Sequence, residues 1–243
     1  MAWLRIIERM ATTHPAQESG TSLTHRLRHV RWIAGGTASG KSTVAAGLVR
    51  EFGVELYSGD RAEQQWIARA VPHRQPRFFA LRDQRPGDNW RGRTGKQAFE
   101  AMPGRSGETV GFLVEDLLAR PAERPVVVDY FGILPRDLAP LLERPEQAVF
   151  LVPTPQFRRA ALRRRYADPR RARANWGDLD PADVIRTRLE RDALWDAEVT
   201  EQAHDLGLPI MTVDGACSAE RIIDRLGRQF GVRADSHEKR PTT

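Results

Sequence analysis

The sequence predicts an α/β fold in which five short parallel strands form one sheet with helices on both faces. Three observations lead to this prediction. Short apolar runs recur along the chain, segments with helical spacing separate them, and a glycine-rich turn follows the first run. Apolar strands that alternate with helices are typical of parallel sheets, because the crossover helices cover both faces.

The elements follow one another in order from the first apolar run. The expected strands cover residues 30–34, 54–57, 125–131, 148–152 and 208–213. The expected helices cover residues 41–52, 62–71, 108–119, 134–142, 156–166, 181–206 and 218–230. Gly53 is suited to end the first of these helices, and Pro181 is suited to begin the longest one.

Composition bounds the class of protein. A chain of 243 residues with 40% hydrophobic residues can bury one domain core. Its single cysteine, Cys217, excludes an internal disulfide and a multi-cysteine metal site. No apolar run approaches the roughly 20 residues of a membrane span, and the N-terminal segment lacks the pattern of a signal peptide. We therefore expect a soluble, cytoplasmic protein.

The domain is expected to cover residues 30–230, between an N-terminal arm, 1–29, and a flexible tail, 231–243. Two segments inside it lack clear periodicity. Residues 72–105 are rich in proline, glycine and arginine, which predicts an insertion rather than core. Residues 167–180 are polar and rich in arginine, which predicts a mobile lid. Both segments follow strands whose carboxyl ends form the usual ligand edge of a parallel sheet.

The charge of the chain bears on whether it binds nucleic acid or a small molecule. The net charge is +6, and nearly all of the 38 basic residues are arginines. Such an excess raises the question of nucleic-acid binding. The arginines are nevertheless spread along the chain among acids, and no aromatic RNA-binding motif is present. We expect a small-molecule partner rather than nucleic acid, and the sequence leaves the oligomeric state open.

Residues 35–42, GGTASGKS, match the phosphate-binding pattern G-x-x-x-x-G-K-[ST] in full. In such a P-loop, glycines let backbone N–H groups point at phosphate oxygens, and the following helix adds its positive end. Lys41 would lie at the β- and γ-phosphates and Ser42 would ligate Mg²⁺. The expected nucleotide-binding residues are Gly35, Gly36, Thr37, Ala38, Ser39, Gly40, Lys41, Ser42 and Thr43. The alternative is a glycine-rich turn that only opens a helix. We expect ATP, or GTP, together with Mg²⁺.

Two aspartates stand at the ends of expected strands. Asp60 follows the second strand, where it could orient an acceptor hydroxyl or take its proton. Asp129 ends the third strand, where P-loop proteins hold a water on Mg²⁺. The alternatives are that Asp60 caps the next helix and that Asp129 only bonds to nearby backbone. The division of roles between the two stays open at this point.

Arginines provide further candidates. Arg164 and Arg188 lie on the helices that flank the expected lid, and arginines stabilise the charge of a transferring phosphoryl group. Arg77, Trp90 and Arg91 lie in residues 72–105 and are candidates for binding an acceptor, since a tryptophan among arginines can stack on a planar or anionic molecule. A tryptophan that only pins an irregular loop fits the pattern equally well.

The chain resembles the nucleoside monophosphate kinase-like group of P-loop kinases, which includes adenylate, shikimate, gluconate and chloramphenicol kinases. Apart from the P-loop, the likeness lies in Asp60, in the basic helix ending at residues 163–165, and in the sequence VIRTRL at residues 184–189. The resemblance implies the strand order 2-3-1-4-5 and a short lid. It also implies that Arg164 and Arg188 face the phosphates and that the backbone around Gly215 cradles adenine.

These observations predict a phosphotransferase that uses ATP and Mg²⁺ to phosphorylate a hydroxyl of a small molecule, such as a nucleoside, a sugar or an antibiotic-like metabolite. A nucleoside monophosphate is the alternative acceptor. A nucleotide-binding switch protein and a nucleic-acid-end kinase are the alternatives from other classes. Residues 72–105 depart from the monophosphate-binding region of adenylate kinases, so the identity of the acceptor stays open.

Overall fold

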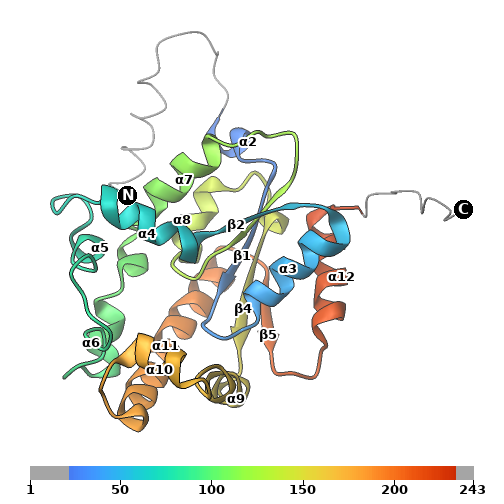
Figure 1. Ribbon diagram of the computed structural model, residues 1–243. Helices are drawn as coiled ribbons and strands as arrows, with labels where there is room; N and C mark the ends of the chain where they lie inside the picture. The colour runs from blue at the N-terminus through green and yellow to red at the C-terminus, as the bar shows by residue number, and fades with distance from the viewer. Residues whose placement is uncertain (1–21, 234–243) are drawn as a thin grey trace, which may run out of the picture.

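A single five-stranded sheet forms the centre of the computed structural model, which describes residues 22–233 (Figure 1). The strands are β1 (Val30–Gly35), β2 (Glu55–Ser58), β3 (Val126–Asp129), β4 (Ala148–Pro153) and β5 (Ile210–Val213). Every pair of neighbours is parallel, and the order is β2-β3-β1-β4-β5. The predicted α/β class, the parallel sheet and the strand order are confirmed.

Helices connect the strands and carry recognisable end signals. They are α2 (Leu23–Arg26), α3 (Lys41–Phe52), α4 (Gly59–Arg69), α5 (Pro76–Phe79), α6 (Gly95–Glu100), α7 (Val110–Leu118), α8 (Pro135–Leu138), α9 (Pro155–Arg165), α10 (Pro169–Trp176), α11 (Pro181–Asp205) and α12 (Ala219–Phe230). Gly53 ends α3 with a φ of +64°, and the side chain of Asp180 accepts from the first N–H groups of α11.

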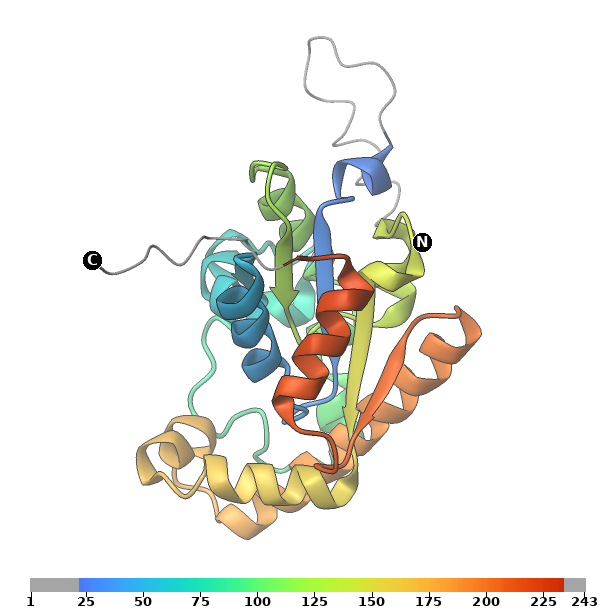
Figure 2. The same ribbon diagram turned by 90° about the vertical axis from the view of Figure 1, so that its right-hand side faces the viewer.

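The sheet is buried on both faces because side chains alternate along each strand. Trp32 of β1 points into one core and Ile33 into the other. Helices α3 and α12 cover the face of Ile33, while α4, α7, α8 and α11 cover the face of Trp32 (Figures 1 and 2). The strands all run toward the end of the molecule where α9 and α10 lie, so their carboxyl ends meet there (Figure 2).

Residues 72–105 contribute to the main core, which corrects the prediction of an insertion outside it. Phe78 of α5, Phe99 of α6 and Met102 are all buried in the larger core cluster. Phe78 packs against Phe112 of α7, with ring centroids 6.1 Å apart. Each short helix here buries only a few residues, and therefore no helical period is visible in the sequence.

The expected lid, residues 167–180, contains helix α10. Its Trp176 is buried in a small cluster with Trp90 and Val184, separate from the two main cores. The described part of the expected arm consists of residues 22–29 and includes α2, whereas residues 1–21 and 234–243 lie outside the described residues. Within residues 22–233, no helix has both the length and the apolar character that a membrane crossing requires.

Candidate active site

The glycine-rich loop, residues 35–42, connects β1 to α3 at the carboxyl edge of the sheet. A Cβ on Gly36 would lie 2.5 Å from Asp196 Oδ1, so only glycine fits there without displacing its neighbours. Gly40 has a φ of +86° immediately before α3. Ala38 has a φ of +61°, which is unusual for a residue with a side chain. The loop therefore curls tightly in front of the helix N-terminus.

Two side chains of the loop and helix converge on one carbonyl oxygen. Lys41 Nζ donates to the Gly36 oxygen at 2.6 Å, and Ser39 Oγ donates to the same oxygen at 2.9 Å. Burial lowers the pKa of Lys41, and the neighbouring carboxylates of Asp129 and Asp60 partly offset that effect. The amine is thus held inside the curl of the loop, close to two acids.

A cleft of about 440 Å³, called the central cleft here, opens over the loop. Residues from the loop, α3, α4, the end of β3, α9, α10 and α11 line it: Thr37, Ala38, Ser39, Gly40, Lys41, Ser42, Thr43, Asp60, Glu63, Asp129, Phe131, Arg165, Asn175, Arg188 and Arg191. The cleft therefore brings together most of the loop with both predicted aspartates and one of the two predicted lid arginines.

Helix α4 places two carboxylates on one side of the central cleft. Asp60 lies in the first turn, and Glu63 follows one turn later on the same helix face. Asp60 is exposed in the cleft, but the surrounding protein keeps much of the bulk water away and raises the pKa of its carboxyl. Burial and repulsion from Asp60 raise the pKa of Glu63 to about 7, although Tyr130 Oη donates to it at 2.9 Å.

Ser42 and Asp129 also line the central cleft, at the start of α3 and the end of β3. Asp129 is buried, with 7% of its surface exposed. Within residues 22–233, no three histidine, cysteine or acidic side chains cluster as a metal site. One hydroxyl and one carboxylate suit Mg²⁺, which takes few protein ligands and completes its shell with water and phosphate oxygens.

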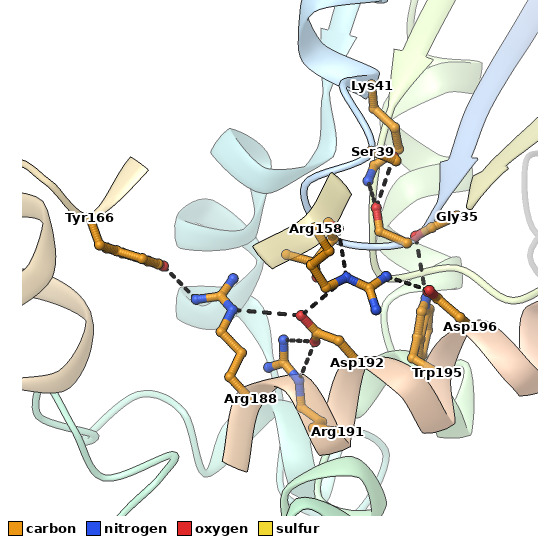
Figure 3. A network of polar contacts seen from close by, with 12 residues as sticks. Gly35, Ser39, Lys41, Arg158, Tyr166, Arg188, Arg191, Asp192, Trp195 and Asp196 are labelled. Carbon is orange, nitrogen blue, oxygen red and sulfur yellow. Dashed lines mark hydrogen bonds and ion pairs between the residues drawn. The ribbon is translucent and has the colours of Figure 1, made fainter. Parts of the chain in front are cut away.

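A buried aspartate on α11 organises the arginines beside the cleft (Figure 3). Asp192 Oδ1 accepts from Arg191 Nε at 2.8 Å, and Asp192 Oδ2 lies 3.7 Å from Arg188 Nε and 4.0 Å from Arg158 Nε. Burial alone would raise the pKa of Asp192, but the attraction of these three guanidinium groups lowers it. Arg188 also donates to Tyr166 Oη and to Asn175 Oδ1, and so joins α11 to α10.

Side chains of α9 and α11 in the same network also donate hydrogen bonds to carbonyl groups of the glycine-rich loop (Figure 3). Arg158 Nε donates to the Thr37 carbonyl at 3.2 Å, and the Arg158 guanidinium pairs with Asp196. Trp195 Nε1 donates to the Gly35 carbonyl at 3.3 Å. Helices α9 and α11 therefore hold the first half of the loop, residues 35–37, in place.

Two residues expected at the nucleotide lie outside the central cleft. Arg164 is exposed and does not line it, whereas the next residue, Arg165, does. A single step along a helix turns a side chain by about 100°, so neighbours on α9 face different directions. Gly215 follows β5 with a φ of +90° and packs near Phe157, beyond the lining of the cleft.

The three residues expected to bind the acceptor have structural roles or face solvent. Arg77 donates to Ser106 Oγ at 2.8 Å and to the Glu100 carbonyl. Trp90 is buried in the small cluster with Trp176 and Val184, under the guanidinium groups of Arg188 and Arg191, and Arg91 is exposed. None of the three lines the central cleft.

The structure also adds residues that the sequence interpretation did not single out. They are Glu63, Phe131, Arg158, Arg165, Asn175, Arg191, Asp192 and Asp196. Glu63 had a usable signal, because it lies three residues after Asp60 on an expected helix. Arg158, Arg165 and Arg191 belong to arginine-rich helices that the sequence indicated, but contacts between distant segments decide which of these arginines faces the cleft. The positions of the remaining residues depend on such contacts as well.

The chain matches no protein-family model and no curated protein sequence. The geometry of the central cleft is therefore the basis for assigning a function.

Proposed function

We propose that this protein is a phosphotransferase that uses ATP and Mg²⁺ to phosphorylate a hydroxyl of a small molecule. The observation that carries the proposal is the composition of the central cleft. A glycine-rich loop with a buried lysine faces Asp60, Asp129 and the guanidinium groups of Arg165 and Arg188 in one space. Phosphoryl transfer needs this combination of phosphate-binding donors, cationic groups and an acid beside the acceptor.

Each group has a defined task in the proposed reaction. The loop N–H groups and Lys41 hold the β- and γ-phosphates, and Arg165 and Arg188 stabilise charge on the transferring group. Ser42 would bind Mg²⁺ directly and Asp129 through water, and the ion would neutralise phosphate charge. The proposal includes a cytoplasmic location, where ATP is available.

The transfer itself exchanges one bond to phosphorus for another. The acceptor oxygen bonds to the γ-phosphorus while the bond from that phosphorus to the β–γ bridging oxygen breaks, and ADP leaves with the electron pair. The hydroxyl proton passes to a carboxylate, and we assign this role to Asp60, which lines the central cleft. The acids Asp60 and Glu63 also favour a neutral hydroxyl over the phosphate of a nucleoside monophosphate, because a phosphate would meet like charge there.

The experiment compares two lysine variants. Lys41→Ala should remove most of the affinity for ATP with Mg²⁺ and nearly all ADP release, since a lost charge-assisted contact costs about 2–4 kcal/mol in the transition state. Lys96→Ala is the matched control, because Lys96 is exposed on α6. Calorimetry measures ATP binding, and ADP release is followed with a panel of hydroxylated acceptors. Unchanged ATP binding by Lys41→Ala would overturn the proposal.

A further inference from the structure

A second space opens beside the central cleft, and three residues form the boundary between the two. This side pocket has a volume of about 160 Å³. Glu63, Phe131 and Arg191 line both spaces. A molecule bound in the side pocket can therefore present one end to the central cleft past these three residues.

The walls of the side pocket are mainly apolar. Leu81, Ala98, Met102 and Phe131 line it, and Ala98 and Met102 are buried. An apolar cavity of about 150 Å³ holds one benzene molecule, so the side pocket has room for one ring-sized group. A polyhydroxylated sugar suits these walls poorly, because hydroxyls that lose water here find few partners.

Two polar side chains, Asn89 and Arg93, line the side pocket but not the central cleft. Among residues 22–233, neither side chain forms a hydrogen bond or an ion pair. The charge of Arg191, by contrast, is matched by Asp192. The free guanidinium group of Arg93 is suited to a carboxylate or a similar anionic group, which it can bind through two parallel hydrogen bonds.

The boundary residue Glu63 can accept a hydrogen bond from a hydroxyl. Tyr130 Oη donates to its Oε1 at 2.9 Å, and Tyr130 is in turn fixed by Thr109 at 2.9 Å. This leaves Oε2 with lone pairs for a ligand in either space. The side pocket thus combines apolar walls with two polar groups. Glu63 can bind a hydroxyl at the boundary with the central cleft, and the guanidinium group of Arg93 lines the side pocket alone.

Building on the phosphotransferase function proposed above, we propose that the side pocket is the acceptor site and takes a compact, ring-sized alcohol with an anionic substituent. The ring packs against Met102 and Phe131, the anionic group pairs with Arg93, and the hydroxyl bonds to Glu63. During transfer, the hydroxyl oxygen bonds to the γ-phosphorus, ADP leaves, and the proton passes to a carboxylate of α4.

The methyl group of Met102 allows a direct test, because Met102 lines the side pocket while Met211 lies in β5. Protein with ¹³C-labelled methionine methyls is titrated with 4-(hydroxymethyl)benzoate, benzyl alcohol, glucose and AMP. We expect 4-(hydroxymethyl)benzoate to shift the Met102 signal saturably and leave Met211 unchanged. Benzyl alcohol should bind about tenfold more weakly, since it lacks the anionic group. Glucose should cause no shift.

Two neighbouring arginines provide matched variants. Arg93→Gln should weaken binding of 4-(hydroxymethyl)benzoate about tenfold and leave benzyl alcohol unaffected. Arg91→Gln should change neither, because Arg91 does not line the pocket. No Met102 shift with either ring compound, tighter binding of AMP, or equal effects of the two variants would overturn the proposal.

A parallel titration with ATP and Mg²⁺ separates the two proposals. ATP binding without a Met102 response to the ring compounds would overturn the acceptor class and leave the phosphotransferase function standing. Ring-compound binding by a protein that does not bind ATP would overturn the phosphotransferase function and leave a ligand pocket of this chemistry.

Discussion

Asp60 and Asp129 are residues of the same type in different environments, and the tasks that we propose for them in the central cleft follow from that difference. Asp60 lies in the first turn of α4 and is exposed, whereas Asp129 is buried at the end of β3. Among the carboxylates near Lys41, that of Asp129 does most to raise the pKa of the lysine ammonium group. An exposed acid on α4 can meet an acceptor, whereas a buried acid beside the lysine is better placed to support the phosphates and their ion.

The first prediction concerns these two aspartates. Asp60→Asn should keep ATP affinity within a few-fold while phosphoryl transfer falls by roughly 10²–10⁴, because an acid–base group is lost from the chemical step. Asp129→Asn should raise the Mg²⁺ concentration needed for activity as well as lower the rate. ATP titrations and ADP release at graded Mg²⁺ concentrations distinguish the variants. Normal transfer by Asp60→Asn, with Asp129→Asn inactive at saturating Mg²⁺, would reverse the assigned roles.

A second prediction follows from the pKa of Glu63. Burial and the nearby Asp60 raise it to about 7, while Tyr130 opposes the shift through its hydrogen bond. Arg191 of α11 lines the same boundary. A protonated Glu63 carboxyl loses acceptor capacity, because Tyr130 already occupies Oε1 and the proton competes for Oε2. We therefore expect kcat/KM to fall as the pH drops through about 7.

The control for this prediction is Glu63→Gln, which keeps the shape of the side chain and cannot ionise. Its kcat/KM should be low and should no longer change near pH 7, while its ATP affinity should match that of the wild type. If kcat/KM of Glu63→Gln still fell as the pH dropped through about 7, the titrating group would be another one. Asp60 is the nearest carboxylate on the same helix.

Among the helices, α10 is attached to the domain through a small apolar cluster. Tyr166 and Trp176 pack with ring centroids 4.6 Å apart, and the buried members of the cluster also include Trp90, Ala172 and Val184. This cluster is separate from both main cores. A helix held in this way can open without disturbing the sheet, because local opening costs less than global unfolding.

We therefore predict that amides of residues 169–176 exchange hydrogen faster than those of α7, which is buried against the sheet. ATP with Mg²⁺ should slow exchange in residues 169–176, since phosphates would bind Arg188, which also holds Asn175. Protection of α7 should not change. Equal protection of residues 169–176 with and without nucleotide would exclude a lid role.

For the molecule as a whole, Asp192 connects regions that are distant in the sequence. Its carboxylate is fully buried and interacts with Arg158, Arg188 and Arg191. Arg158 then reaches the Thr37 carbonyl of the glycine-rich loop. Removal of this single charge would leave the buried guanidinium groups of Arg188 and Arg191 without their carboxylate partner, whereas Arg158 would keep Asp196.

We predict that Asp192→Ala lowers the free energy of unfolding by about 3–5 kcal/mol, as measured by urea denaturation. Glu201→Ala is the matched control on the same helix, because Glu201 is exposed, and it should change stability by less than about 0.5 kcal/mol. A small effect of Asp192→Ala would show that water or neighbouring acids compensate the arginines without it.

Short-range signals in the chain were sufficient to predict the sheet, its parallel strands and the position of the glycine-rich loop between β1 and α3. Each of these signals is contained within a few residues, such as the apolar runs of the strands, Gly53 after α3 and Asp180 before α11. Because parallel strands end at one edge, the strand pattern alone also placed Asp60 and Asp129 beside the loop.

Packing between distant segments selected the side chains that complete the cleft. Arg165 rather than Arg164 lines it, because α9 packs with one face toward the loop. Glu63 and Arg93 line the side pocket through segments that the fold brings together, among them α6 and α11. Asp192 gathers arginines from two helices. Such positions depend on contacts between residues that are far apart along the chain, and a local sequence pattern contains no information about the direction of that packing.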